Sequence, residues 1–174
     1  MDNFEIVGEL PVEHGSYCLI FHLKNSINDS IGKFGKFYFN PGYYYYFGSA
    51  KGSGGLRARI KRHISLEKKK FWHLDYVRTH LIFTAAVFTM QMNLECAWCQ
   101  KIQENPVFNV SVKGFGASDC SVFCKAHLLR SDFLMDFNEF SKYLKNPDSN
   151  NDQLYLFFQE NLESTVKSRG KIKF

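Results

Sequence analysis

The hydrophobic and polar positions of the first fifty residues alternate in blocks typical of strands and turns. Residues 15–23 are apolar at nearly every position, which predicts a strand buried on both faces. Residues 25–33 are rich in Asn, Asp, Ser and Gly and predict a turn. Residues 34–39 and 43–48 predict two further strands, separated by the Asn-Pro-Gly break at 40–42. We expect the strands over 15–23 and 43–48 to share one antiparallel sheet.

The hydrophobic period lengthens in the next part of the chain. Leu56, Ile60 and Ile64 recur every four residues, which predicts a helix with one apolar stripe. Residues 69–80 predict a second helix, and the apolar residues 81–90 predict another buried strand. The chain therefore passes from strands to helices and back within one hundred residues, as in an α+β domain.

Two more helices are expected before the chain changes character. Residues 93–104 predict a helix that the side chain of Asn93 could cap. A glycine-containing loop follows, and Ser118 or Asp119 is positioned to cap a helix that runs to about Arg130.

The segment 131–174 has the pattern of a separate helical extension. Two amphipathic stripes are joined by the polar linker 146–152 and predict one helix each; they consist of Phe133, Phe137, Phe140 and Leu144, and of Leu154, Phe158, Leu162 and Val166. We therefore predict an α+β domain over residues 1–130, with a small central antiparallel β-sheet flanked by helices. A two-helix C-terminal extension over 131–174 would pack on this core or on a partner.

Charge is distributed unevenly, and this changes the picture more than the net value of +5. Between Lys51 and Lys70, eight basic residues stand against Glu67 alone. Such a concentrated patch is typical of proteins that bind a polyanion, although a solvated helix face can carry a similar run. Residues 131–163 are acidic in contrast, with seven acidic and two basic residues.

Composition limits the compartment and the class of protein. Hydrophobic residues make up 45% of the chain and aromatic residues 17%, enough for a packed core. No apolar run reaches the roughly 18 residues of a membrane span, and the first residues lack the pattern of a signal peptide. Five cysteines, an odd number, argue against a disulfide framework. We expect a cytoplasmic protein.

Candidate chemistry lies in four short motifs that occur in a fixed order. Two motifs lie on predicted strands: Gly15-Ser16-Tyr17 and Tyr46-Phe47-Gly48. A predicted helix carries Arg59 and His63, four residues apart, and a later predicted helix carries Glu95. This series closely resembles the GIY-YIG nuclease superfamily. The strings "GYYYYFGSA", "GGLRARIKRH", "WHLDY" and "GFGASDC" resemble one uncharacterised archaeal and bacterial branch, which is sometimes fused to endonuclease III.

The resemblance implies a role for each of the five residues. Tyr17 would help to activate water, and Tyr46 would position water or phosphate. Arg59 would contact a phosphate oxygen, and His63 would shuttle a proton or donate to phosphate. Glu95 would hold one divalent cation, Mg²⁺ in the first place and Mn²⁺ as the alternative.

Further residues are candidates for contacts around this site. Basic residues of the patch would bind nucleic acid: Lys51, Arg57, Lys61, Arg62, Lys68, Lys69 and Lys70. Polar residues of the neighbouring motifs are candidates to line the cleft: Ser49, His73, Asp75, Ser118 and Asp119.

The cysteines raise a rival interpretation. The order Cys96-x2-Cys99, then Cys120-x3-Cys124-x2-His127 approximates the spacing of a zinc site. Cys96 and Cys99 are expected within a helix rather than on a turn, and buried free cysteines are common in cores. The spacing thus leaves structural zinc open but favours core packing. Cys120 and Cys124 are also two residues further apart than in the branch pattern.

The sequence supports a leading function and two alternatives. The first is a metal-dependent endonuclease that hydrolyses DNA, directed by structure or lesion; the fusion to a glycosylase in relatives links it to DNA repair. The second is a non-catalytic nucleic-acid-binding module on the same fold, and the third is a nuclease that acts on RNA. The helical extension is a candidate site for a protein partner, and no membrane association is expected.

Overall fold

A central sheet organises the computed structural model, which describes residues 3–118, 120, 122–145 and 153–159. These residues form a seven-stranded sheet, in the order β1-β9-β6-β2-β5-β8-β7. The strands are β1 (Glu5–Val7), β2 (Gly15–Leu23), β5 (Gly42–Ala50), β6 (Ile82–Thr89), β7 (Asn109–Val110), β8 (Leu128–Ser131) and β9 (Tyr155–Phe157). The pair β1 and β9 is parallel, whereas the other pairs are antiparallel, so the sheet is mixed.

The continuous apolar run of β2 places this strand at the centre of the sheet. It pairs with β5 on one side and β6 on the other, and it is buried on both faces. In the register with β5, Tyr17 is opposite Gly48 and Ser16 is opposite Ser49. The two tyrosine-containing motifs are therefore cross-strand neighbours.

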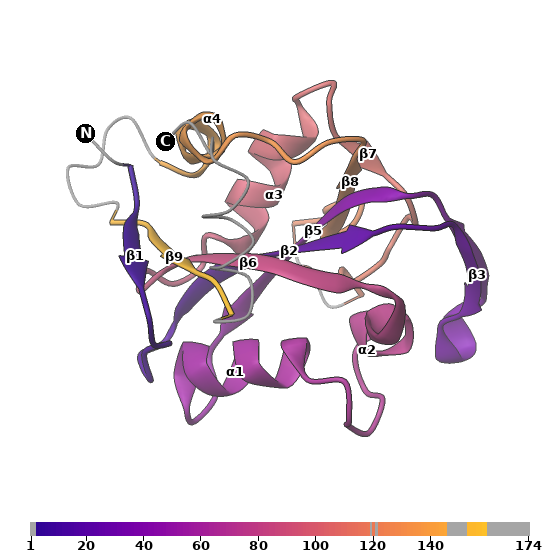
Figure 1. Cartoon of the computed structure of the whole chain (residues 1–174), viewed down its shortest axis with the longest axis horizontal. Coiled ribbons are helices and arrows are strands. Elements are labelled where there is room, and N and C mark those ends of the chain that lie inside the picture. The colour runs from indigo at the N-terminus through magenta and orange to yellow at the C-terminus, as the bar shows by residue number, and fades with distance from the viewer. Residues whose placement is uncertain (1–2, 119, 121, 146–152, 160–174) are drawn as a thin grey trace.

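Helices cover both faces of the sheet (Figure 1). On one face lie α1 (Gly55–Ile64), α2 (His73–Val77) and the short 3-10 helix η2 (Arg78–His80); on the other lie α3 (Glu95–Gln103) and α4 (Phe137–Leu144). Each face has its own hydrophobic cluster, with Leu56 and Ile60 of α1 in one and Trp98 of α3 in the other. A separate ribbon is formed by β3 (Ile27–Ser30), η1 (Gly32–Phe34) and β4 (Lys36–Phe39).

The predicted α+β class is confirmed, as are the strands at β2, β4, β5 and β6 and the helices at α1, α2, α3 and α4. The antiparallel sheet is a partial match, because β1 and β9 are parallel. The helix expected up to Arg130 is wrong: the chain forms turns and then strand β8, which pairs with β5. The apolar residues there serve the sheet rather than a helix stripe.

The C-terminal extension packs on the core through a helix and a strand. Asp136 caps α4 by accepting hydrogen bonds from the backbone N–H groups of Asn138 and Glu139. The second predicted helix is wrong at residues 155–157, which form β9 between β1 and β6. Residues 160–174 lie outside the described residues. Among the described residues, no helix is long and apolar enough to cross a membrane.

Candidate active site

One cavity of about 270 Å³ brings together the five residues that the sequence predicts to be catalytic. Tyr17 comes from β2 and Tyr46 from β5, while Arg59 and His63 project from α1 and Glu95 from the first turn of α3. The i, i+4 spacing of Arg59 and His63 puts both side chains on one face of α1. The cavity is thus built from four elements that span residues 15–103 of the sequence.

A glycine opposite Tyr17 makes room for its phenol. A Cβ atom at Gly48 would overlap the Tyr17 hydroxyl and ring, so no other residue fits there without displacing Tyr17. Tyr17 is 2% exposed. Burial, and then the neighbouring Tyr46, raise the pKa of Tyr17 well above its usual value, and Arg59 offsets this only in part. The hydroxyl is therefore a neutral group in the protein alone.

Aromatic rings surround His63. The ring centroid of Tyr46 lies 5.4 Å from that of His63, and those of Tyr17 and Trp72 lie 6.0 and 6.4 Å away. Burial, followed by the charge of Lys68, lowers the pKa of His63 to about 3. Its Nδ1 atom has no hydrogen-bond partner among the described residues. His63 is thus a neutral imidazole with an unused nitrogen.

The end of α1 is fixed by a buried arginine. The guanidinium of Arg78 donates hydrogen bonds to the backbone carbonyl oxygens of His63 and Ile64, at 3.0 and 2.6 Å. These are carbonyl groups that have no partner within the helix. Arg78 thereby satisfies the last turn of α1, the turn that carries His63.

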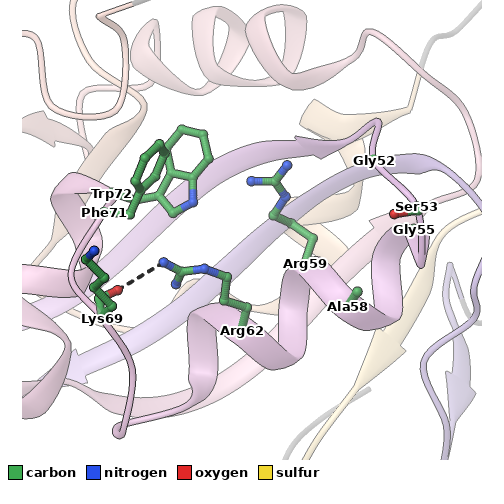
Figure 2. Close-up of a pocket in the computed structure, with 9 residues that line it drawn as sticks. All are labelled: Gly52, Ser53, Gly55, Ala58, Arg59, Arg62, Lys69, Phe71 and Trp72. Carbon is green, nitrogen blue, oxygen red and sulfur yellow. Dashed lines mark hydrogen bonds between the residues drawn. The ribbon is translucent and has the colours of Figure 1, made fainter.

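A second hollow, of about 480 Å³, lies beside the cavity and shares Arg59 and Trp72 with it. Figure 2 shows Arg59 and Arg62 projecting from α1 toward the segment with Phe71 and Trp72. The Arg59 guanidinium carbon lies 5.0 Å from the centre of the Trp72 ring, a cation–π distance. The side chain of Phe71 is 73% exposed at the rim. This hollow therefore offers cations beside the exposed ring of Phe71 and the half-buried ring of Trp72.

Glu95 makes two close contacts in the cavity. Its Oε2 accepts a hydrogen bond of 2.7 Å from Ser49 Oγ, and its Oε1 lies 2.7 Å from Nδ1 of His127. The second contact is at ion-pair distance, but the ring N–H is not aimed along it. Burial by itself raises the pKa of Glu95, whereas the contacts with His127, Ser49 and Lys51 more than offset this and lower it. The carboxylate is therefore ionised.

The predicted nucleic-acid-binding residues are divided among different surroundings. Lys51 lines the cavity, and Arg62 and Lys69 line the adjoining hollow. Arg57 and Lys61 line a separate hollow with Glu9 and Phe157.

The remaining two cations of the patch have partners of their own. Lys68 is drawn inward, because its Nζ atom lies 2.8 Å from Oδ1 of Asp75 and bonds two carbonyl groups of α1. Lys70 lies over the ring of Tyr76.

The candidate cleft-lining residues differ in the same way. Ser49 lines the cavity through its bond to Glu95. His73 accepts a hydrogen bond from the Gly116 N–H and stacks on Phe34, and it lies outside the lining. Asp75 is buried and pairs with Arg62 and Lys68. Ser118 is exposed, and Asp119 lies outside the described residues.

Four of the five predicted zinc ligands converge next to Glu95. Cys96, Cys120, Cys124 and His127 each offer one ligand atom, and these atoms all lie within 4.8 Å of one another. Cys99 is separate: its thiol donates a hydrogen bond to the carbonyl oxygen of Ala126 and is fully buried. The cluster shares Cys96, Cys120 and His127 with the cavity wall.

Sequence reasoning missed three features of the cavity. Trp72 forms a wall beside Arg59, and Gly116 packs against Tyr46 at a backbone φ of +72°. The contact of His127 with Glu95 was also missed, because the spacing of two distant residues in the sequence does not say whether their side chains meet. Positive φ favours glycine, so the Gly-rich string at 114–116 was the available signal for a close approach.

Comparison with known families gives one match. The model of a domain of unknown function, DUF123, matches residues 16–146. The chain belongs to the DUF123 family. The match spans β2 to α4 and so includes all the cavity residues named above. No curated protein and no solved structure matches this DUF123 chain.

Proposed function

We propose that this DUF123 protein is a metal-dependent endonuclease that hydrolyses phosphodiester bonds in DNA. The observation that carries the proposal is the convergence of Tyr17, Tyr46, Arg59, His63 and Glu95 on one cavity. Phosphodiester hydrolysis needs a cation for developing negative charge and groups that orient the attacking water. The cavity supplies both kinds of group. A GIY-YIG-like fold and a link to DNA repair remain parts of this proposal.

The cations around the cavity suit a bound phosphate. Arg59 presents a guanidinium at the boundary of cavity and hollow, and Lys51 lines the cavity from the loop that follows β5. A guanidinium stays charged at any working pH and can bond two phosphate oxygens at once. We assign Arg59 to the scissile phosphate and Lys51 to the same or the next phosphate.

The neutral groups suit the attacking water. The hydroxyl of Tyr17 can donate and accept hydrogen bonds without ionising, and the unused Nδ1 of His63 can accept one. Both groups are buried, which strengthens hydrogen bonds that are aligned for reaction. We assign Tyr17 and His63 to orienting the water, with Tyr46 holding the ring of His63 from the side.

Glu95 fits the role of the metal ligand. Its carboxylate offers about four lone-pair positions, and its contacts with Ser49 and His127 use two directions. Mg²⁺ accepts a single protein carboxylate because it keeps water ligands, and Mn²⁺ is the alternative. A divalent cation there would neutralise charge on the phosphate and would lower the pKa of a bound water molecule.

The hollow favours a substrate with unstacked bases. Phe71 and Trp72 stand among Arg59, Arg62 and Lys69, which combines rings for base stacking with charges for the backbone. Arg62 is already paired with Asp75, and Arg59 is assigned to phosphate, so neither guanidinium is left to read a base edge. We therefore propose cutting directed by structure or lesion rather than by sequence.

Cleavage of labelled substrates tests the proposal. Plain duplex, single strand, flap, bubble, abasic duplex and RNA hairpin would be incubated with Mg²⁺, Mn²⁺ or EDTA. We expect metal-dependent cutting of flap or bubble DNA that Arg59→Ala and Glu95→Ala each reduce at least ~100-fold. Lys142→Ala, on the exposed side of α4, is the matched control and retains full activity.

Two other outcomes would overturn the proposal. Salt-sensitive binding with no cutting of any substrate identifies a nucleic-acid-binding module. Preferential cutting of the RNA hairpin identifies an RNA nuclease, because the phosphate contacts alone do not distinguish the two nucleic acids.

A further inference from the structure

The cluster beside Glu95 has the dimensions of a tetrahedral metal site. The Sγ atoms of Cys96 and Cys120 are 3.5 Å apart, and Cys96 Sγ lies 3.7 Å from Nε2 of His127. Zinc binds thiolate sulfur at about 2.3 Å, so two sulfurs of a tetrahedral site are separated by about 3.8 Å. Cys124 completes a set of three sulfurs and one imidazole nitrogen, all within 4.8 Å of one another.

Neither a disulfide nor hydrogen bonding among thiols accounts for the cluster. The sulfur atoms of a disulfide are bonded at about 2.05 Å, well inside the separation of Cys96 and Cys120. Thiols are weak hydrogen-bond donors, so three of them gain little by gathering around one imidazole. Unlike Cys99, which packs into the core, Cys96, Cys120 and Cys124 are only partly buried.

The backbone between Cys120 and Cys124 makes a tight turn. The N–H group of Cys120 donates a hydrogen bond to the carbonyl oxygen of Ala117. Between Cys120 and Cys124, Phe123 has a φ of +56° and is 91% exposed. A left-handed conformation is costly for a residue with a large side chain, and nothing packs on the ring in return. A bound ion would account for this strained turn.

We propose that Cys96, Cys120, Cys124 and His127 bind one structural zinc ion beside the cleft. Three thiolates and an imidazole in a closed set of four match the ligands of structural zinc sites, and soft sulfur ligands disfavour Mg²⁺. The ion joins the first turn of α3 to the loop that follows β7. This proposal rests on its own geometry and stands whether or not the chain is a nuclease.

The zinc site meets the cleft at His127 and Glu95. Nε2 of His127 lies 3.7 Å from the sulfur of Cys96, and its Nδ1 lies 2.7 Å from Oε1 of Glu95. In metal sites a ligand histidine commonly contacts a carboxylate through its other nitrogen, which fixes the ring. Glu95 thus has two neighbours of different kinds: it supports the zinc ligand His127, and it faces the cavity. Zinc binding therefore holds the carboxylate in place.

Metal analysis of the reduced full-length chain tests the proposal. We expect about one zinc per chain in the wild type, retained through gel filtration. Cys99→Ser is the matched control, since it lies one helical turn from Cys96 but outside the cluster; it keeps its zinc. Cys120→Ser and Cys124→Ser lose it, and Glu95→Gln weakens zinc binding about 10–100-fold.

A second measurement covers variants that fail to fold. Wild-type protein stripped of metal and loaded with Co²⁺ should show thiolate-to-cobalt charge-transfer bands and the intense visible bands of tetrahedral cobalt. Cys99→Ser should show the same bands. A wild-type chain that carries no zinc and gives no such spectrum overturns the proposal, as does zinc that survives in folded Cys120→Ser and Cys124→Ser. Loss of nuclease activity alone bears on the function and not on this site.

Discussion

On one side of the cleft, Arg59 and His63 stand on α1, whose buried residues Leu56 and Ile60 fix the helix against the sheet. On the other side, Glu95 stands on the first turn of α3 and His127 on a loop with little regular structure. Both helices pack on the sheet, α3 through Trp98, but the second side also depends on an irregular loop that meets Glu95 through the polar contact of His127. A long loop without secondary structure is uncommon in a compact domain unless something else orders it.

Because of this difference, the two sides of the cleft should respond differently to perturbation. A packed helix keeps its register as long as its apolar stripe is intact. A loop that is ordered by a cluster of ligands depends on the ion that joins them, since metal binding and folding are coupled. The two sides can therefore be perturbed separately. The effect of each perturbation should appear in the residues of the perturbed side and not in those of the other.

Zinc removal should have the largest effect, and it should be confined to the loop side. At a zinc concentration about 1,000 times the dissociation constant, binding contributes about 4 kcal/mol to the free energy of unfolding. Chelation should lower the melting temperature accordingly. Hydrogen exchange should speed up in residues 111–118 and 122–127, whereas residues 55–64 keep their protection. Equal loss of protection in both segments would contradict the comparison.

Tyr17→Phe should lower the cleavage rate without loosening the packing of the first side of the cleft. The ring stays in place against Gly48, and only the hydroxyl is lost, so we expect a rate about 100-fold lower, or ~2.7 kcal/mol. Tyr44→Phe is the matched control, because Tyr44 lies on the same face and donates a hydrogen bond to the carbonyl oxygen of Asn40. Single-turnover cleavage and the melting temperature would be measured for both. A normal rate in Tyr17→Phe would remove this hydroxyl from the proposed chemistry.

The two sides also differ in how far the sequence predicts them. The periodicity of Leu56 and Ile60 placed α1, and the apolar run at 15–23 placed β2, because one repeating pattern decides each element. The order of motifs then predicted that Tyr17, Arg59 and Glu95 belong to one site, and in the structure they line one cavity. That much of the site followed from local pattern and resemblance.

The loop side could not be predicted in the same way. The proposed zinc ligands on this side come from a helix and a loop. No hydrophobic periodicity in the sequence marks a loop whose cysteine side chains converge. The helix expected up to Arg130 was wrong because Leu128 and Leu129 belong to strand β8, and short apolar runs suit either element. Phe158 was assigned to a helix stripe for the same reason. In the structure, the neighbouring residues 155–157 form a strand that pairs with β6.

The segment after α1 should lose stability in acid. Burial raises the pKa of Asp75, but the bonds from Lys68, from the N–H groups of Trp72 and Phe71, and from Arg62 bring it down to about 2. Because this lies below its usual value of 3.8, the stabilisation is complete above about pH 4 and is lost as the pH falls toward 2.

A pH series of unfolding free energies measures this contribution. We expect Asp75 to account for about 2 kcal/mol at neutral pH. Asp75→Asn should cost about this much at pH 7 and much less near pH 2. Asp132→Asn, an exposed aspartate beside β8, is the control and should leave the profile unchanged. A difference that does not shrink in acid would assign the effect to lost packing.

The smallest expected effect concerns the exposed ring at the rim of the hollow. Phe71→Ala should weaken binding to flap or bubble DNA by about 1 kcal/mol, or about fivefold, since a stacked base loses its platform. Binding to plain duplex should stay the same, because paired bases do not reach the ring. Phe133→Ala removes another exposed ring, near α4, and serves as the control. Fluorescence anisotropy at fixed salt would compare these affinities, and an equal loss for duplex and flap would show that Phe71 supports the loop rather than a base.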